Sequence, residues 1–205
     1  MARSARRRRH HRPGAGSRGA RGRFPGRGLG PEKGTLALLP QVVRAVRCPV
    51  VAAGGVADAA GVAAARALGA AGVQVGTAYL LCPEAQTSAV HRQSLRNDAA
   101  RHTALTTLFS GRPARGIVNR LMRELGPVQA AALPFPLAAA VAPLRARAES
   151  QGSGDYSPLW CGQNASSCAE RPAAEITRAL AAGWQGGGRA PRAPAGGLRH
   201  NQRQE

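Results

Sequence analysis

Apolar residues and turn residues alternate between positions 39 and 77 in a pattern that predicts two successive helix–strand units. The first helix carries apolar residues at helical spacing, at Leu39, Val42, Val43 and Val46. We expect Pro40 in the first turn of this helix, where its missing N–H costs nothing. Pro49 then ends the helix, and the wholly apolar residues 50–53 predict a strand of the kind found in parallel sheets.

The second unit follows directly and has the same order of elements. Asp58 can cap a helix, and Val62, Ala65 and Gly69 mark one of its faces. A turn at residues 69–72 leads into a strand at residues 73–75. Because the connections are short, the two strands should be parallel, with a right-handed crossover between them.

The remainder of the chain predicts a mainly helical segment. Its expected elements are a helical turn at 78–81, a polar helix at 84–98, an extended stretch at 103–109, a turn at 110–113, a helical stripe at 114–125, a helix at 137–144 disturbed by Pro143, a loop at 155–167, and a helix at 173–180 ended by Gly183. No internal repeat is evident in the sequence.

Each predicted strand ends in small residues, first at Ala53, Gly54 and Gly55, and then at Gly76 after Gln74 and Val75. Glycine lets a ligand approach the backbone closely, and free N–H groups at the start of a helix suit a phosphate. Two such turns on successive strands resemble the phosphate site that follows the last two strands of a (β/α)₈ barrel. The alternative is two tight turns that bind nothing.

The fold class predicted from these patterns is therefore α/β: the C-terminal portion of a TIM (β/α)₈ barrel, comprising its last two βα units, plus a mainly helical C-terminal segment. Neither turn fits the phosphate loop of nucleoside triphosphatases or the dinucleotide fingerprint. A single phosphomonoester, as in a flavin mononucleotide or a sugar phosphate, fits the pattern better.

Charge divides the 205 residues into three parts. The net charge is +19, and residues 1–34 contribute +10 of it through ten Arg and one Lys against one Glu. This Arg- and Gly-rich stretch shows no periodicity, and we expect a disordered basic arm at 1–34 and a disordered tail at 186–205. The domain at 35–185 then has about 150 residues, whereas a complete barrel typically has about 250.

The basic arm leaves three interpretations open. It could bind nucleic acid or another polyanion without specificity, it could be a transit peptide lacking an amphipathic pattern, or it could have no selected role. No apolar run approaches the length of a membrane span, and no apolar stretch follows the basic start as in a signal peptide. The four cysteines show neither a zinc-binding nor a disulfide pattern, and we expect a cytoplasmic protein without a metal site.

Four stretches together resemble the nitronate monooxygenase family, formerly called 2-nitropropane dioxygenases. They are residues 48–77, with Ala-Ala-Gly-Gly-Val-Ala-Asp and Gly-Val-Gln-Val-Gly-Thr; His91-Arg92; residues 109–116, Phe-Ser-Gly-Arg-Pro-Ala-Arg-Gly; and residues 157–163, Ser-Pro-Leu-Trp-Cys-Gly-Gln. In the last stretch Cys161 stands where the family usually has Ala. The likeness covers about residues 36–182.

The resemblance implies an FMN-dependent barrel and assigns the phosphate contacts. The residues that it assigns to FMN are Ala53, Gly54, Gly55, Gln74, Val75, Gly76 and Thr77. In the family a histidine in a Gly-Gly-His-type turn, on an earlier strand, acts as the base, and nothing before Leu36 matches that turn. No catalytic residue is therefore assigned, and His91 and His102 are interpreted as surface or packing residues.

Two further assignments have structural alternatives. Arg112 and Arg115 could bind an anionic substrate, or they could anchor the turn and cover the core with their stems. Trp160 and Gln163 could close over the flavin, although a residue such as Trp160 is more often a packing anchor.

The implied activity is the FMN-dependent oxidation of alkyl nitronates by O₂, in a chain that is truncated and inactive if the base is missing. One alternative is an FMN-dependent enoyl-thioester reductase, which shares the fold. Another is a basic, non-catalytic polyanion-binding protein. Open barrel edges would also favour self-association or a partner that carries the missing strands.

Overall fold

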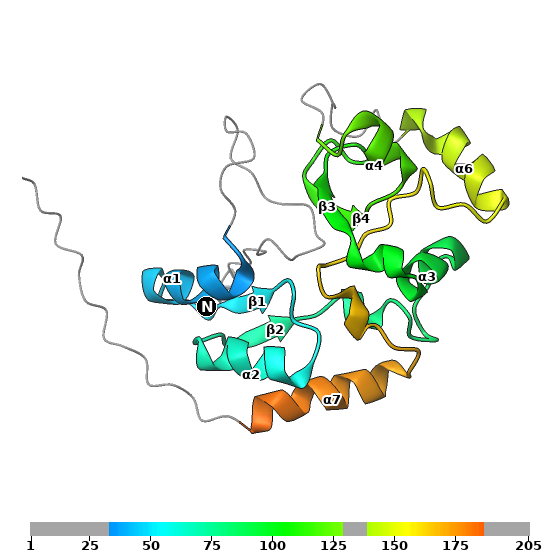
Figure 1. Cartoon of the computed structure of the whole chain (residues 1–205). Coiled ribbons are helices and arrows are strands. Elements are labelled where there is room, and N and C mark those ends of the chain that lie inside the picture. The colour runs from blue at the N-terminus through cyan, green and yellow to red at the C-terminus, as the bar shows by residue number, and fades with distance from the viewer. Residues whose placement is uncertain (1–32, 129–138, 187–205) are drawn as a thin grey trace, which may run out of the picture.

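The computed structural model describes residues 33–128 and 139–186, and its elements are labelled in Figure 1. They are α1 (Thr35–Ala45), β1 (Val51–Ala53), α2 (Ala59–Ala67), β2 (Gly72–Gln74), η1 (Thr77–Tyr79), α3 (Ala89–Arg96), η2 (Asp98–Arg101), β3 (Thr103–Thr106), β4 (Ala114–Ile117), α4 (Arg120–Leu125), α6 (Ala142–Ser150), η3 (Ala165–Ser167) and α7 (Ala173–Gln185). The expected arm and tail lie outside the described residues, except for Lys33, Gly34 and Gly186.

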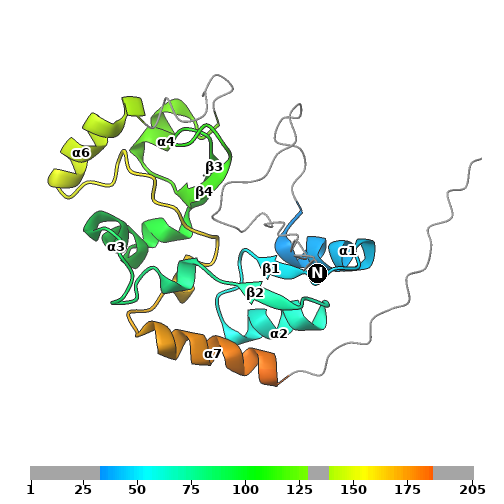
Figure 2. The ribbon, with the colours of Figure 1, turned by 180° about the vertical axis from the view of Figure 1, so that it is seen from behind.

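A parallel β1–α2–β2 unit occupies one end of the molecule, as predicted. Val51 pairs with Gly72 and Ala53 with Gln74, so β2 begins one residue earlier than expected. Asp58 caps α2 by accepting a hydrogen bond from the Gly61 N–H at 2.7 Å, which confirms the predicted cap. In Figures 1 and 2, α2 lies between the two-stranded sheet and α7.

Two apolar clusters hold this end together. Leu39 of α1 packs with Val50 and Ala65 on one side of the sheet, while Val62 of α2 packs with Ile176 of α7. The prediction for the start of α1 was wrong, because the helix begins at Thr35 and contains Pro40 in its interior. The helix is retained without that N–H because its apolar face is buried against β1 and α2.

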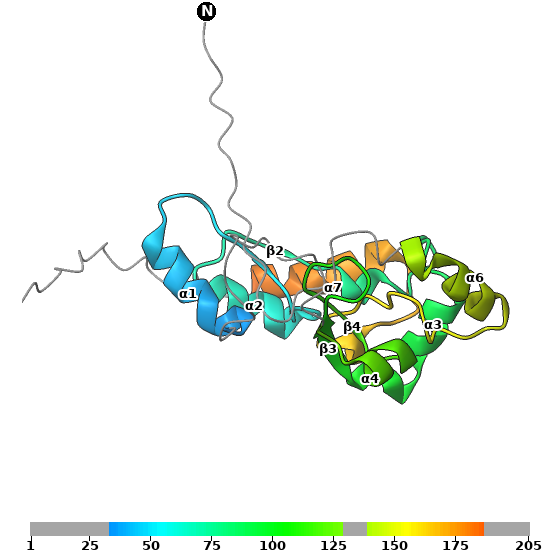
Figure 3. The ribbon, with the colours of Figure 1, turned by 90° about the horizontal axis from the view of Figure 1, so that it is seen from above.

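The other end of the molecule is built on an antiparallel hairpin of β3 and β4. Seen from above in Figure 3, α1 and α2 lie at one end, and β3, β4, α4 and α6 lie at the other. The extended stretch predicted at 103–109 is shorter, since β3 ends at Thr106. The predicted disturbance at Pro143 is absent because this residue stands in the first turn of α6, where proline is tolerated.

The helical stripe predicted at 114–125 was wrong in its first half, which is strand β4. Ala104 pairs with Gly116 across the hairpin, and Gly116 also forms a bridge with Trp160. A Cβ on Gly116 would lie 3.0 Å from the Leu159 carbonyl oxygen, so the backbones approach closely there. The apolar spacing of this stretch suited a helix, but pairing with distant residues decided for a strand.

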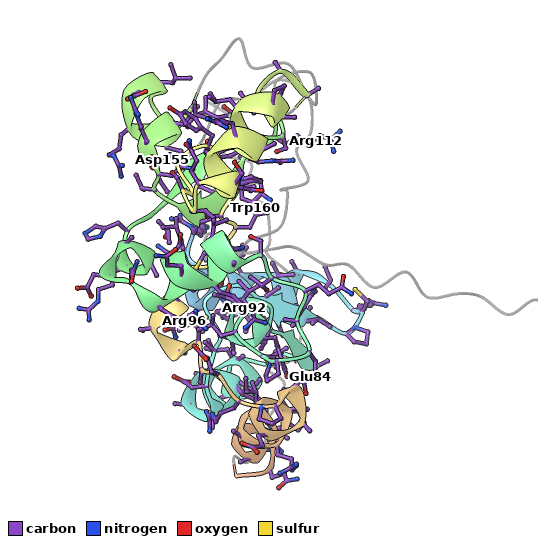
Figure 4. All side chains as sticks on the ribbon, turned by 90° about the vertical axis from the view of Figure 1, so that its right-hand side faces the viewer. Glu84, Arg92, Arg96, Arg112, Asp155 and Trp160 are labelled. Atoms are coloured by element: carbon purple, nitrogen blue, oxygen red, sulfur yellow. The ribbon has the colours of Figure 1, made fainter. Side chains whose placement is uncertain are left out.

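The polar helix predicted at 84–98 is reduced to α3, and Arg92 shows why. Its guanidinium donates hydrogen bonds to the carbonyl oxygens of Leu81, Cys82, Ala85 and Thr87, at 2.6 to 3.2 Å. These four carbonyls all precede α3, which begins only after the Ser88 cap, so they accept from the Arg92 side chain and not from a helix ladder. Arg92 lies in the middle of the molecule in Figure 4.

Gly183 does not end the last helix, contrary to the prediction. Helix α7 continues to Gln185, and Gly183 is buried against α2. A Cβ at this position would lie 2.0 Å from the Ala59 carbonyl oxygen. The glycine therefore allows two helices to approach closely, and it has no role as a helix terminator.

Helix α7 obtains its N-terminal cap from a distant loop. Pro172, at the N-cap position, provides no side-chain hydrogen bond, and the Glu84 carboxylate accepts from the Ala173 N–H at 3.0 and 3.2 Å. In Figure 4, Glu84 lies beside α7. This contact satisfies one of the donors that every helix start leaves open.

Replacing Glu84 by alanine is expected to lower the free energy of unfolding by about 1 kcal/mol, the usual value of a cap. Glu175→Ala is the matched control, because Glu175 lies in the first turn of the same helix and interacts mainly with its dipole. Its loss should be about 0.3 kcal/mol. Urea denaturation of both variants measures the difference, and equal losses would contradict a specific role for Glu84.

None of the helices in the described part of the chain is long and apolar enough to cross a membrane.

Candidate functional site

The carboxyl ends of β1 and β2 lie side by side. Ala53 and Gln74, the last residues of the two strands, are paired directly in the parallel register. The two loops that follow therefore begin at the same end of the sheet. One loop contains Gly54 and Gly55, and the other contains Val75 and Gly76. The structure brings together the two turns that the sequence analysis assigned to one phosphate.

The turn after β1 has a backbone that only glycine adopts easily. Gly54 and Gly55 have φ values of +110° and +75°, in the region that side chains disfavour. Gly55 is exposed, and a Cβ built on it would meet no protein atom within 4 Å. The turn is therefore exposed at Gly55, with open space beside the backbone there.

The helix that follows this turn contributes less than expected to an anion site. The Asp58 carboxylate already occupies the N-terminus of α2 through its bond to Gly61. A negative charge there offsets the partial positive charge of the helix end. Any anion bound at this edge would depend on the loop amides rather than on the helix dipole.

The turn after β2 presents Gly76 and Thr77. Gly76 precedes η1 without a side-chain cap, is exposed, and like Gly55 has open space where a Cβ would stand. The Thr77 hydroxyl accepts a hydrogen bond from the Gly162 N–H at 2.9 Å. Gln74 is exposed, whereas Val75 packs against the cluster between α2 and α7.

The other residues singled out in the sequence are engaged in packing or lie at the surface. Arg115 is buried on β4 and donates to the Thr103 carbonyl at 3.2 Å, while Arg112 is exposed on the outside of the molecule (Figure 4). Trp160 packs edge-to-face against Phe109, with ring centroids 5.6 Å apart. These contacts favour structural roles for Arg115 and Trp160.

A shallow apolar groove runs between α1 and β1. Its lining residues are Thr35, Leu38, Leu39, Val42, Val50, Val51, Ala52 and Ala53. Ala53 is the one candidate site residue among them, so the groove and the glycine turns are neighbouring but different features.

No group of three or more His, Cys, Asp or Glu side chains within residues 33–128 and 139–186 could hold a metal ion. His91 lies on α3 and His102 follows η2, both remote in sequence from the strand ends. His10, His11 and His200 lie outside the described residues.

None of the four cysteines, all of which lie in the described residues, forms a disulfide, and Cys82 is buried. Burial raises the pKa of the Cys82 thiol above its ordinary value, and the Glu84 carboxylate raises it further. The folded state therefore holds this proton at a pH at which the unfolded chain has released it.

We expect the free energy of unfolding to fall as the pH rises above 9.0, the ordinary value for this thiol, because ionisation then favours the unfolded state. Cys82→Ala should lose this part of the pH dependence, as measured by urea denaturation from pH 7 to 10. In the folded protein, iodoacetamide should modify the partly exposed Cys48 faster than Cys82. An identical pH slope in the variant, or equal alkylation rates, would contradict this assignment.

A parallel β1–α2–β2 unit with glycine turns at one edge, joined to a helical segment, defines a mixed α/β protein. The profile of the nitronate monooxygenase family matches residues 13–183. The chain therefore belongs to the nitronate monooxygenase family, whose members are oxidoreductases. This finding confirms the resemblance stated from the sequence, and the match begins within the stretch predicted to be a disordered arm.

Curated relatives agree with this assignment. The chain is 42% identical over 149 residues to a nitronate monooxygenase of Pseudomonas aeruginosa, covering 72% of this chain and 42% of that protein. It is 44% identical over 138 residues to a probable nitronate monooxygenase of Bacillus subtilis, covering 67% and 40%. The chain thus spans less than half the length of these relatives.

Solved structures show the same relationship. A nitroalkane oxidase from Streptomyces ansochromogenes superposes with a TM-score of 0.77 at 38% identity, covering 84% of this chain and 50% of that one. FabK from Thermotoga maritima superposes with a TM-score of 0.61 at 26% identity, covering 85% and 53%.

Proposed function

We propose that this chain forms the phosphate end of an FMN site in an enzyme that oxidises alkyl nitronates with O₂. The direct pairing of Ala53 with Gln74 is the observation that carries the proposal, because it brings both glycine turns to one edge of the sheet. Family membership supports the substrate class and the cofactor. The chain would correspond to the last two βα units of a TIM barrel.

The residues present fit a phosphate. The amides at Gly54 and Gly55 would bind it from one side, and those at Gly76 and Thr77 from the other. Open space at Gly55 and Gly76 leaves room for phosphate oxygens against the backbone. Neutral amides can hold a dianion without a lysine when several of them converge.

FMN, when bound, would supply the redox chemistry between the nitronate and O₂. The task of this chain is to hold the cofactor by its phosphate, with Gln74 and Thr77 at the rim and Val75 anchoring the loop in the core. No described residue is assigned as the base. Contacts to the flavin ring and the base would come from the part of a complete barrel that lies outside residues 35–185.

Isothermal titration of the full chain with FMN and with riboflavin tests the proposal. FMN should bind at least about tenfold more tightly, since hydrogen bonds to a charged group contribute about 1.5–3 kcal/mol each. Inorganic phosphate should weaken FMN binding but leave riboflavin binding unchanged. Equal affinities for the two flavins would overturn the assignment.

Non-specific binding of FMN to the Arg-rich residues 1–34 has to be separated from binding at the strand ends. The titration is therefore repeated with heparin in excess, which saturates basic sequences. FMN binding that persists supports the strand-end site, and binding that heparin abolishes favours the polyanion-binding alternative. Reduction of an enoyl thioester by NAD(P)H, without nitronate turnover, would favour the reductase alternative.

The lateral edges of β1 and β2 bear on how the chain assembles with other strands. The parallel sheet has two strands, β1 and β2, and each has one lateral edge that pairs with no other described strand. Such edges readily pair with other strands. We propose that they join the remainder of a barrel or a second copy of the chain, in a cytoplasmic protein.

A further inference from the structure

Thr77 is held by two residues far along the chain. Its hydroxyl accepts from the Gly162 N–H at 2.9 Å, and its carbonyl oxygen accepts from the Cys168 thiol at 3.0 Å. Both contacts come from the segment that contains η3, which packs against η1. A residue at the strand end is thereby fixed by the C-terminal segment.

Because the Thr77 hydroxyl accepts from Gly162, its own proton is left for donation to a different group. A hydroxyl has one proton to donate and two lone pairs to accept with. The Gly162 N–H occupies one lone pair, so the proton is directed to another acceptor. Among the described contacts of this hydroxyl, no acceptor for that proton is found. The geometry suits donation to an anion at the strand ends.

The segment that supplies the Gly162 N–H is itself anchored. Cys161 is fully buried and its N–H donates to the Arg115 carbonyl of β4 at 3.1 Å, while the Leu159 carbonyl accepts from the Ile117 N–H at 2.8 Å. The position of the Gly162 N–H is thus fixed by the hairpin at the other end of the molecule. A buried N–H of this kind is costly to leave unpaired, which holds the Thr77 rotamer in place.

Cys168 acts on the backbone of the same residue. The Thr77 carbonyl already accepts from the Leu80 N–H at 3.0 Å, the bond that closes η1. The Cys168 thiol adds a second donor to this carbonyl and ties η1 to the end of η3. A weak S–H bond contributes little stability, but it restrains the turn that carries Gly76 and Thr77.

We infer that Gly162 and Cys168 are positioning residues, which orient the Thr77 hydroxyl and backbone toward the FMN phosphate. The inference rests on the proposed function, because it requires a phosphate at the ends of β1 and β2. It gives a role to Gly162 of the Trp-Cys-Gly-Gln segment, which contacts Thr77 after the second strand.

The test compares the FMN and riboflavin dissociation constants of Thr77→Ser, Thr77→Val and Cys168→Ala. Thr77→Ser keeps the hydroxyl and should keep the wild-type preference for FMN. Thr77→Val should reduce this preference about tenfold, and Cys168→Ala about threefold, with riboflavin affinity unchanged in both. Cys48→Ala, another partly exposed cysteine, is the matched control and should match the wild type.

A purely structural role would weaken both flavins equally or lower thermal stability without changing their ratio. If the wild type prefers FMN while Cys168→Ala or Thr77→Val retains the same ratio, the inference is overturned. If the wild type shows no preference, the proposed phosphate site itself fails. Should Thr77→Val not fold, the ratio in Cys168→Ala still decides.

Discussion

Replacing Gly55 by alanine is expected to weaken FMN binding about tenfold or more while leaving riboflavin binding unchanged. Gly55 has a φ of +75° and open space where a Cβ would stand, at the edge shared by both turns. A methyl group there would occupy the space proposed for a phosphate oxygen and disturb the loop amides. The loss of one hydrogen bond to a charged group accounts for about 1.5–3 kcal/mol.

Gly152→Ala is the matched control for this variant. Gly152 has a φ of +76° and also has no protein atom within 4 Å of an added Cβ, but it follows α6 at the other end of the molecule. Both variants therefore introduce the same backbone strain, about 1–2 kcal/mol. Isothermal titration should show weaker FMN binding in Gly55→Ala alone, and an equal effect in both would refute a phosphate at Gly55.

The second large effect is expected at Gly183, where alanine should lower the free energy of unfolding by about 3 kcal/mol. Its Cβ would lie 2.0 Å from the Ala59 carbonyl oxygen, and neither helix backbone can yield as a flexible side chain would. Helices α2 and α7 would have to separate. Separation would disturb the cluster that joins Val62 to Ile176.

Gly186→Ala serves as the control, because Gly186 lies directly after the same helix. There the Cβ would meet its nearest atom, the Ala182 carbonyl oxygen, at an ordinary 3.7 Å. The free energy of unfolding of Gly186→Ala should stay within about 0.5 kcal/mol of the wild-type value. Denaturation in guanidinium chloride measures both variants, and equal stability would show that α2 and α7 adjust without cost.

Backbone amides, rather than cationic side chains, define the candidate anion site. Arg115, a buried basic residue of one of the matched motifs, uses its guanidinium to donate to Thr103. Asp58 adds a negative charge at the start of α2. The proposed site would select a phosphate by geometry, because the amide directions would be set by the two loops.

Local chemistry made the β1–α2–β2 unit predictable from the sequence. The apolar run that ends at Ala53 has the character of a buried strand. Asp58 caps α2 by accepting from the N–H of Gly61, three residues further along. Short connections between these elements imply parallel strands, and Ala53 does pair with Gln74. The adjacency of the two glycine turns therefore followed from residues close together in the sequence.

Contacts between residues far apart in the sequence determined the other elements of the fold. The apolar spacing of β4 suited a helix, but Gly116 lies against Leu159 and the stretch is a strand. Gly183 was predicted to end the last helix, but it lies against Ala59 within that helix. The cap that Glu84 provides for α7 and the bond from Gly162 to Thr77 join residues more than eighty positions apart.

By itself, then, the sequence determined the family and the parallel unit, and it predicted the residues of the candidate site. Only the tertiary structure decided how α7 is capped, where it ends and how Thr77 is oriented. The physical reason is the range of the interactions involved. Caps and strand patterns act within a few residues, whereas close backbone approach and long-range hydrogen bonds exist only once the chain has folded.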